Sequence, residues 1–111
     1  MPVMTRRTPV KKREENATLG VTINAKVGER FYIDLQRYDP KPGSAWLDQY
    51  DPSALTLNAA GFVAQYEGAG ILWWEFTALT VGTTQVTIVD QPHLINPLFI
   101  NRIYTVNVSA K

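Results

Sequence analysis

Few side chains in this sequence could carry covalent chemistry. His93 is the single histidine and cysteine is absent, which excludes thiolate nucleophiles, disulfides and a typical zinc site. A catalytic triad would have to combine His93 with a serine, and the chain's three serines lie in no nucleophile-elbow pattern. The acidic residues show no calcium-loop spacing. We therefore predict that the protein is not an enzyme and that it binds neither a metal nor a cofactor.

The residues better suited to function are those that could present a binding surface. Phe31, Ile33 and Leu35 alternate with polar neighbours, which predicts a strand with one buried face. The alternation stops at a segment with two prolines, which restrict φ, followed by a glycine, and this composition predicts a projecting loop. Its candidate contact residues are Asp39, Pro40, Lys41, Pro42 and Gly43.

From residue 17 onward, short apolar segments alternate with turn signals. No segment has the period of a long amphipathic helix, and turns about 8–12 residues apart are typical of an antiparallel β-sandwich. We predict an all-β, immunoglobulin-like antiparallel sandwich of seven or eight strands over residues 17–111, preceded by an extended arm at residues 1–16. The expected strands are residues 19–23, 30–35, 45–49, 55–57, 62–66, 71–79, 84–89 and 102–109, with a turn at 58–61.

Three wide connections separate strands whose other links are short. They follow Gln36, Glu67 and Asp90, and they gather at one end of the sandwich if alternate connections lie at opposite ends. The third connection is unusually apolar, which favours a surface buried by a partner over a loop folded back on the sandwich. Beyond the first loop, the candidate contact residues are Gly68, Gly70, Trp73, Pro92, His93, Leu94, Leu98 and Phe99.

The three tryptophans divide between core and surface. Trp46 and Trp74 fall at inward positions, so we expect both in the core. Trp73 has the opposite phase to Trp74. It is therefore either covered by a neighbouring loop or exposed as a contact for a partner.

The first thirteen residues differ in charge from the rest of the chain. They hold five basic residues and no acid, whereas the remainder has six basic residues against ten acidic ones. Such an arm is a solvated tail, a nucleic-acid contact or an anchor on an acidic protein surface. Nucleic acid is disfavoured because the arm has no aromatic residue to stack on bases and the body is acidic. The candidate anchoring residues are Arg6, Arg7, Lys11, Lys12 and Arg13.

The sequence shows neither a secretory signal nor a membrane span. The basic N-terminal residues precede no hydrophobic segment, and no apolar run approaches the roughly 18–20 residues of a span. We therefore expect a location in the cytoplasm or in a virion or other assembly, without membrane contact.

The order of several motifs resembles that of the chagasin family of cysteine-protease inhibitors. These motifs are VGE before a strand, DPKPGSAW, GAG before a later strand, GTTQVTIVDQPHL and the closing YTVNVSAK, within residues 17–111. The resemblance implies an immunoglobulin-like sandwich that blocks papain-type proteases with three loops at one end. Pro40, Gly43 and Trp46 match the family's first loop motif, NPTTG followed by an aromatic residue and Trp. Gly68 and Gly70 match its GxG-type second loop.

The loops also depart from the family pattern. Asp39, Lys41 and Pro42 replace an asparagine and two threonines of the first motif. The third loop keeps only a proline, Pro92, of an RPW-type motif. Small hydroxyl side chains let a loop enter a narrow cleft and hydrogen-bond there, whereas a proline side chain has no donor.

These features suit three functions. We expect a non-enzymatic, protein-binding module with a structural role, attached to a larger array such as a virion or capsid (a decoration protein) through its arm and apolar loop, with self-association as a further option. The alternative is inhibition of a papain-like cysteine protease. A third hypothesis is a module that binds carbohydrate or a cell surface through Trp73 and Tyr38.

Overall fold

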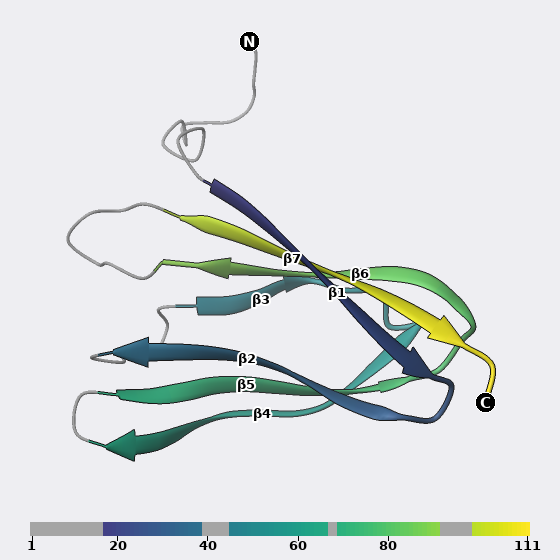
Figure 1. Ribbon diagram of the computed structural model, residues 1–111, viewed down its shortest axis with the longest axis horizontal. Helices are drawn as coiled ribbons and strands as arrows, with labels where there is room; N and C mark the ends of the chain where they lie inside the picture. The colour runs from purple at the N-terminus through teal and green to yellow at the C-terminus, as the bar shows by residue number, and fades with distance from the viewer. Residues whose placement is uncertain (1–16, 39–44, 67–68, 92–98) are drawn as a thin grey trace, which may run out of the picture.

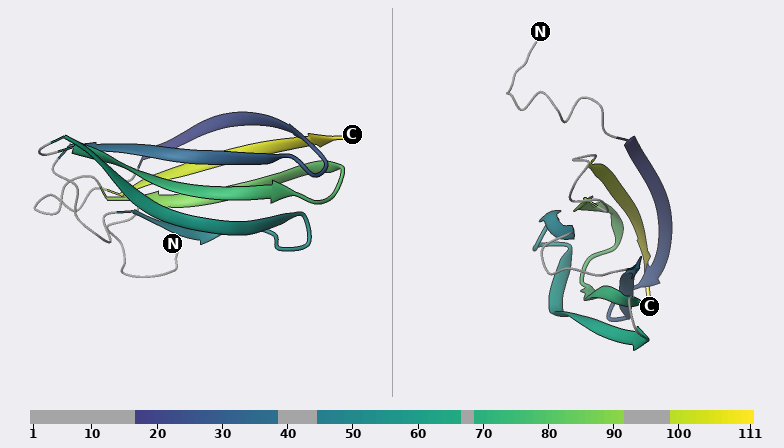
Figure 2. Two further views of the ribbon diagram at one scale, coloured as in Figure 1. Left: turned by 90° about the horizontal axis from the view of Figure 1, so that it is seen from below. Right: turned by 90° about the vertical axis from the view of Figure 1, so that its left-hand side faces the viewer.

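The computed structural model describes residues 17–38, 45–66, 69–91 and 99–111, which form seven β-strands (Figure 1). The strands are β1 (Ala17–Lys26), β2 (Arg30–Tyr38), β3 (Ala45–Gln49), β4 (Leu55–Tyr66), β5 (Ala69–Ala78), β6 (Gly82–Asp90) and β7 (Ile100–Ser109). They form two sheets, with strand orders β1-β7-β6-β3 and β2-β5-β4. The two sheets lie face to face (Figure 2), so the predicted all-β, immunoglobulin-like sandwich is confirmed.

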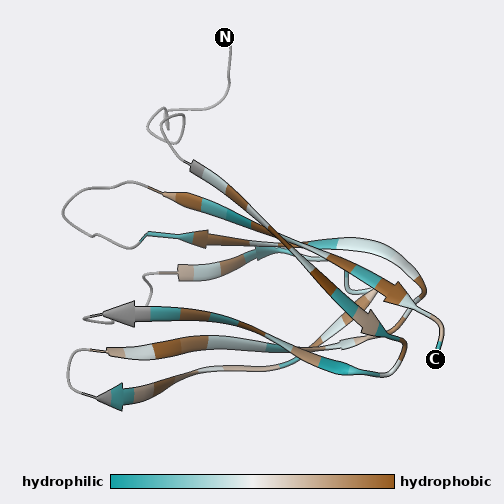
Figure 3. Ribbon diagram, in the orientation of Figure 1, coloured by the Kyte–Doolittle hydropathy of each residue, from teal (hydrophilic) through white to brown (hydrophobic). Residues whose placement is uncertain are grey.

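Alternation along the strands builds the core between the two sheets. Ile33, Trp74 and Phe76 are buried, as their phase in the sequence predicts. From the other sheet, Ile88 and Val106 are also completely buried at inward positions. Hydrophobic positions therefore occur along the strands of both sheets (Figure 3), and packing of these side chains holds the layers together.

One strand pair departs from the antiparallel arrangement that we expected. β1 lies parallel to β7, with Ala17 opposite Ile100 and Lys26 opposite Ser109. The short turn after Lys26 carries the chain into the other sheet, so β1 and β2 do not form a hairpin within one sheet. β1 pairs instead with the last strand, which runs in the same direction (Figure 1).

The turn that we expected at residues 58–61 does not exist. β4 is one strand of twelve residues, with an irregular register between Leu57 and Ala59. Asn58 lies at this bulge, where its Nδ2 donates a hydrogen bond of 2.7 Å to Thr77 Oγ1 on β5. A bulge takes up one extra residue without ending the pairing, which is why a turn-like sequence remains inside a strand.

Two glycines in this sheet lie directly under aromatic rings. A Cβ on Gly61 would lie 2.9 Å from Trp73 Cζ2, because the indole of Trp73 covers the backbone of the neighbouring strand. A Cβ on Gly70 would overlap the Phe62 ring and lie 2.8 Å from the carbonyl oxygen of Val63. Both positions require glycine because a ring or a backbone oxygen occupies the space of a side chain.

We predict that Gly70→Ala lowers the free energy of unfolding by about 2 kcal/mol, because the fixed carbonyl oxygen of Val63 cannot move aside. Gly20→Ala on β1 is the matched control, since a Cβ there meets no atom within 4 Å. Its effect should stay within about 0.5 kcal/mol. Denaturant unfolding of both variants measures the difference, and equal stabilities would contradict this packing.

The turn between β3 and β4 is held by one aspartate. Asp51 Oδ1 accepts hydrogen bonds from the backbone nitrogen of Ser53 (2.9 Å) and from its hydroxyl (2.7 Å). These bonds stabilise the carboxylate, so they lower the pKa of Asp51 below 3.8. Asp51 therefore contributes stability above the pKa of an unfolded aspartate, about 3.9, and the contribution is lost as the pH falls through the lowered pKa.

We predict that Ser53→Ala raises the pKa of Asp51 toward 3.8, because it removes the hydroxyl donor and keeps the backbone donor. Thr80→Ala is the control, since that hydroxyl bonds the carbonyl oxygen of Ser53 and not the carboxylate. An NMR titration of the Asp51 carboxyl group measures both. An unchanged pKa in Ser53→Ala would show that the hydroxyl does not act on the carboxylate.

Candidate protein-binding site

The strand ends that border the three predicted loops meet at one end of the sandwich. β2, β4 and β6 finish there, and β3, β5 and β7 begin there (left in Figure 1). We call this the loop end. The turns from β1 to β2, β3 to β4 and β5 to β6 lie at the opposite end. The two sheets thus bring together the stems of three connections that are far apart in the sequence.

Most of the predicted contact residues lie outside the described residues. These are the five basic residues of the arm (Arg6, Arg7, Lys11, Lys12, Arg13) and the loop residues Asp39, Pro40, Lys41, Pro42, Gly43, Gly68, Pro92, His93, Leu94 and Leu98. Three predicted residues are described, namely Gly70, Trp73 and Phe99. Gly70 is buried in β5 under Phe62, so packing within the sheet explains why a glycine stands there.

A buried ion pair joins the two stems of the third connection. Asp90 ends β6 with a side chain of 0% exposure, and its Oδ2 lies 2.8 Å from Nε of Arg102 on β7. The Arg102 side chain is only 26% exposed. A carboxylate that is removed from water needs such a partner, because an unpaired buried charge is strongly destabilising. The pair therefore holds the end of β6 and the beginning of β7 in one arrangement.

This ion pair was not predicted from the sequence, although the sequence contains a signal for it. Asp90 follows Val86 and Ile88 at the same alternating phase, which places it on the inward face of β6. Arg102 precedes Tyr104 and Val106 in the same way on β7. An acid and a base at inward positions of two adjacent strands indicate a buried ion pair.

Trp46 is not in the core, which corrects our expectation. It pairs with Val89 on the outer face of its sheet and is 39% exposed, whereas Ala45, beside it, is buried. Its ring meets Phe99 edge-on, with ring centroids 6.2 Å apart and planes at 77°. Trp46 is the second residue of β3, after the first connection, and Phe99 precedes β7 after the third. This aromatic pair therefore links the stems of two connections across the loop end.

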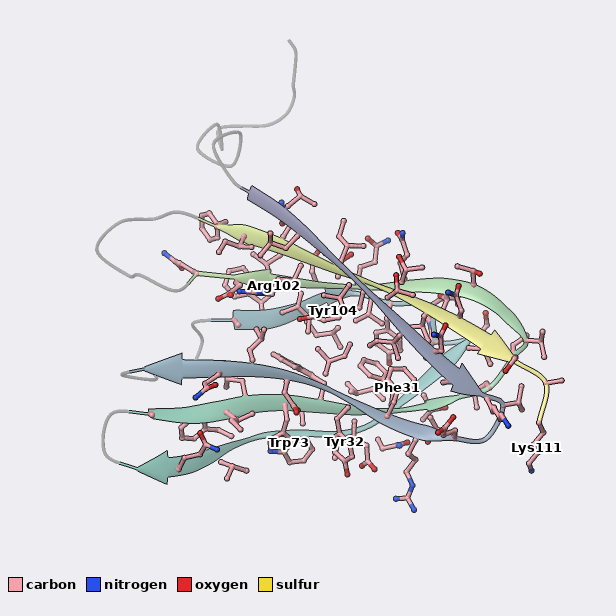
Figure 4. All side chains as sticks on the ribbon, in the orientation of Figure 1. Phe31, Tyr32, Trp73, Arg102, Tyr104 and Lys111 are labelled. Atoms are coloured by element: carbon pink, nitrogen blue, oxygen red, sulfur yellow. The ribbon has the colours of Figure 1, made fainter. Side chains whose placement is uncertain are left out.

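Trp73 lies on the outer face of the β2-β5-β4 sheet. Its ring is partly buried, with the backbone of Gly61 on one side and Tyr32 edge-on at a centroid distance of 6.0 Å (Figure 4). Tyr32 OH donates a hydrogen bond of 3.2 Å to Glu75 Oε2, and Arg30 Nη1 lies 3.4 Å from the same oxygen. The bond to Glu75 and its negative charge raise the pKa of Tyr32. Residues of its own sheet thus cover Trp73 in part. Trp73 lies within β5, four residues after Ala69, the first residue of that strand.

The described residues do not assemble a catalytic or metal-binding group. Within residues 17–38, 45–66, 69–91 and 99–111, no three acidic or histidine side chains gather to hold a metal ion. Ser53 bonds Asp51 at the end opposite the loop end. None of the described segments forms a helix long and apolar enough to cross a membrane.

Comparisons with known proteins show what this fold resembles. No protein-family model matches the sequence, and no curated protein matches it. Amebosin, solved in solution, is 20% identical with a TM-score of 0.62, covering 85% of this chain and 98% of amebosin. The cysteine protease inhibitor EhICP2 from Entamoeba histolytica is 16% identical with a TM-score of 0.57, covering 84% and 94%. PbICP-C, solved in complex with falcipain-2, is 12% identical with a TM-score of 0.64, covering 86% and 92%.

The fold is therefore chagasin-like, as the sequence motifs predict. The expected structural role on a virion or capsid is wrong. Among these similar structures, EhICP2 is a cysteine protease inhibitor and PbICP-C was solved in complex with falcipain-2, and none of the three points to a larger assembly. The basic arm, on which that expectation was largely based, lies outside the described residues.

We predict that Arg102→Met lowers the free energy of unfolding by about 3 kcal/mol, because it removes the guanidinium that lies beside the fully buried Asp90 carboxylate. The double variant Asp90→Asn with Arg102→Met should recover part of this loss, since neither side chain is then charged. Asp48→Asn, on an exposed carboxylate of β3, is the control and should change stability by less than about 0.5 kcal/mol.

Urea unfolding of the wild type and these three variants measures the differences in the free energy of unfolding. If Arg102→Met unfolds at the same urea concentration as Asp48→Asn, the ion pair does not stabilise the loop end.

Proposed function

We propose that the protein is a reversible inhibitor of papain-like cysteine proteases, and that the loop end enters the substrate cleft of the enzyme. The observation that carries this proposal is the fold. The structural match with PbICP-C, a protein solved in complex with falcipain-2, covers 86% of this chain. The stems of three connections meet at one end of this fold, which suits contact with a cleft.

The stems support binding by shape. The ion pair between Asp90 and Arg102 and the ring contact between Trp46 and Phe99 fix the described ends of the first and third connections. The first connection also contains Pro40 and Pro42, which restrict the backbone in the free protein. A binding surface that is already ordered loses less conformational entropy when it meets its partner, and this raises affinity.

The inhibition that we propose is non-covalent. The protein has no cysteine, so it offers the enzyme no thiolate. It is a binding protein and not an enzyme in this proposal. The protease should therefore regain activity when the complex dissociates, and an enzyme with a blocked catalytic thiol should still bind when the blocking group is small.

A titration of papain with the purified protein tests the function. We expect activity on a small peptide substrate to fall to near zero at an equimolar ratio when both proteins are at micromolar concentration. Gly43→Arg should weaken inhibition at least ten-fold, because a long charged side chain would stand in the first connection. Gly20→Arg is the matched control, since Gly20 is exposed on β1 with no atom near a Cβ, and it should inhibit like the wild type.

Lack of inhibition at micromolar concentration, tested on papain and on two further proteases of the same class, would contradict the function. Equal inhibition by Gly43→Arg and Gly20→Arg would contradict the role of the first connection. Dialysis of the inhibited enzyme with recovery of activity distinguishes reversible binding from covalent inactivation.

A further inference from the structure

The edge strand β4 has an unusual composition. Its twelve residues, Leu55–Tyr66, contain no charged side chain and no proline. Among the described strands β4 pairs with β5 alone, so no described strand uses the backbone N–H and C=O groups on its other side. An edge of this kind readily accepts another strand, and proteins commonly prevent such pairing with charges, prolines or short strands.

The other three edges of the described sheets carry such features. β1 ends in Lys26, and β3 is only five residues long and includes Asp48. β2 carries Arg30, Asp34 and Arg37 along its length. Among the described strands, β4 is therefore the edge whose sequence does least to prevent pairing.

The middle of β4 is both regular and uncovered. Its two register irregularities lie between Leu57 and Ala59 and between Ala64 and Tyr66, so residues 59–64 form an uninterrupted ladder with β5. Phe62 is on the inward face and Val63 on the outward face, yet they are 45% and 51% exposed. This part of β4 is therefore exposed on both faces.

We propose that β4 pairs antiparallel with β4 of a second copy of this chain, so that two three-stranded sheets join into one sheet of six. A two-fold axis perpendicular to the sheet, between Phe62 of one copy and Phe62 of the other, uses the same strand on both sides and therefore closes at two copies. The uncharged strand suits itself as a partner, because self-pairing places no like charges opposite one another. Side chains of each face then meet side chains of the same face, so Phe62 lies opposite Phe62 of the second copy and Val63 lies opposite its Gly61.

The geometry of this dimer leaves the loop ends free. β4 runs toward the loop end (Figure 1), so antiparallel pairing points the two loop ends in opposite directions. Each copy could then bind its own protein partner. The dimer is independent of the proposed inhibition and is tested without any protease.

Sedimentation of the wild-type protein over a concentration series tests the proposal. We expect a reversible equilibrium between monomer and dimer, without larger species. Val63→Lys should raise the dimer dissociation constant at least ten-fold, because it places a charge on the pairing strand of each copy. Val21→Lys is the matched control, since Val21 is 47% exposed on the edge strand β1, and it should dimerise like the wild type.

Hydrogen exchange locates the interface. Amides within residues 59–64 that are not bonded to β5 should become protected as the concentration rises, and those of β1 should not. A wild-type protein that stays monomeric up to about millimolar concentration overturns the proposal. Dimerisation of Val63→Lys with unchanged affinity overturns it as well. So does a Val21→Lys variant whose dimer is weakened as much as that of Val63→Lys, and so does the formation of open-ended oligomers. Circular dichroism of both lysine variants shows that each is folded.

Discussion

The structure depends most on how the charge of Asp90 is satisfied inside an apolar sandwich. Its carboxylate is fully buried and lies 2.8 Å from the guanidinium of Arg102 on the next strand. A shift of one residue in the pairing of β6 with β7 would turn one of the two side chains to the other face and separate the charges. The ion pair therefore fixes the register of the strands that border the third connection, and the aromatic pair of Trp46 and Phe99 relates them to β3.

The second sheet is ordered by a different constraint, the close approach of aromatic rings to the backbone. Trp73 lies on Gly61 and Phe62 lies over Gly70, across the same pair of strands. Each ring covers a position where β4 or β5 has no side chain, which lets β4 continue through a run of small residues as one strand. Sheet geometry thus comes from ring and glycine pairs in one layer and from a buried ion pair in the other.

Alternation in the sequence was sufficient to predict the two layers and much of their core, including Ile33, Trp74 and Phe76. It failed where the phase depends on the exact start of a strand. Trp46 stands at the second residue of β3, and its phase follows from pairing with Val89, which local sequence does not specify. The expected turn at residues 58–61 failed for a related reason, because pairing with β5 keeps a turn-like sequence extended. Each residue of β1 pairs in parallel with a residue of β7 that is 83 positions away in the chain, and this leaves no local signal.

The position of the loop end was predictable from the sequence, and the role of the protein was not. Counting alternate connections placed three loops at one end, and the stems of all three meet there. The expectation of an assembly role came from composition, chiefly the basic arm and the apolar third connection. Composition does not show which surfaces lie on the same side of the molecule, whereas the fold does. It separates the loop end from the uncharged edge of β4, so two proteins could occupy these two surfaces at once without competing for the same residues.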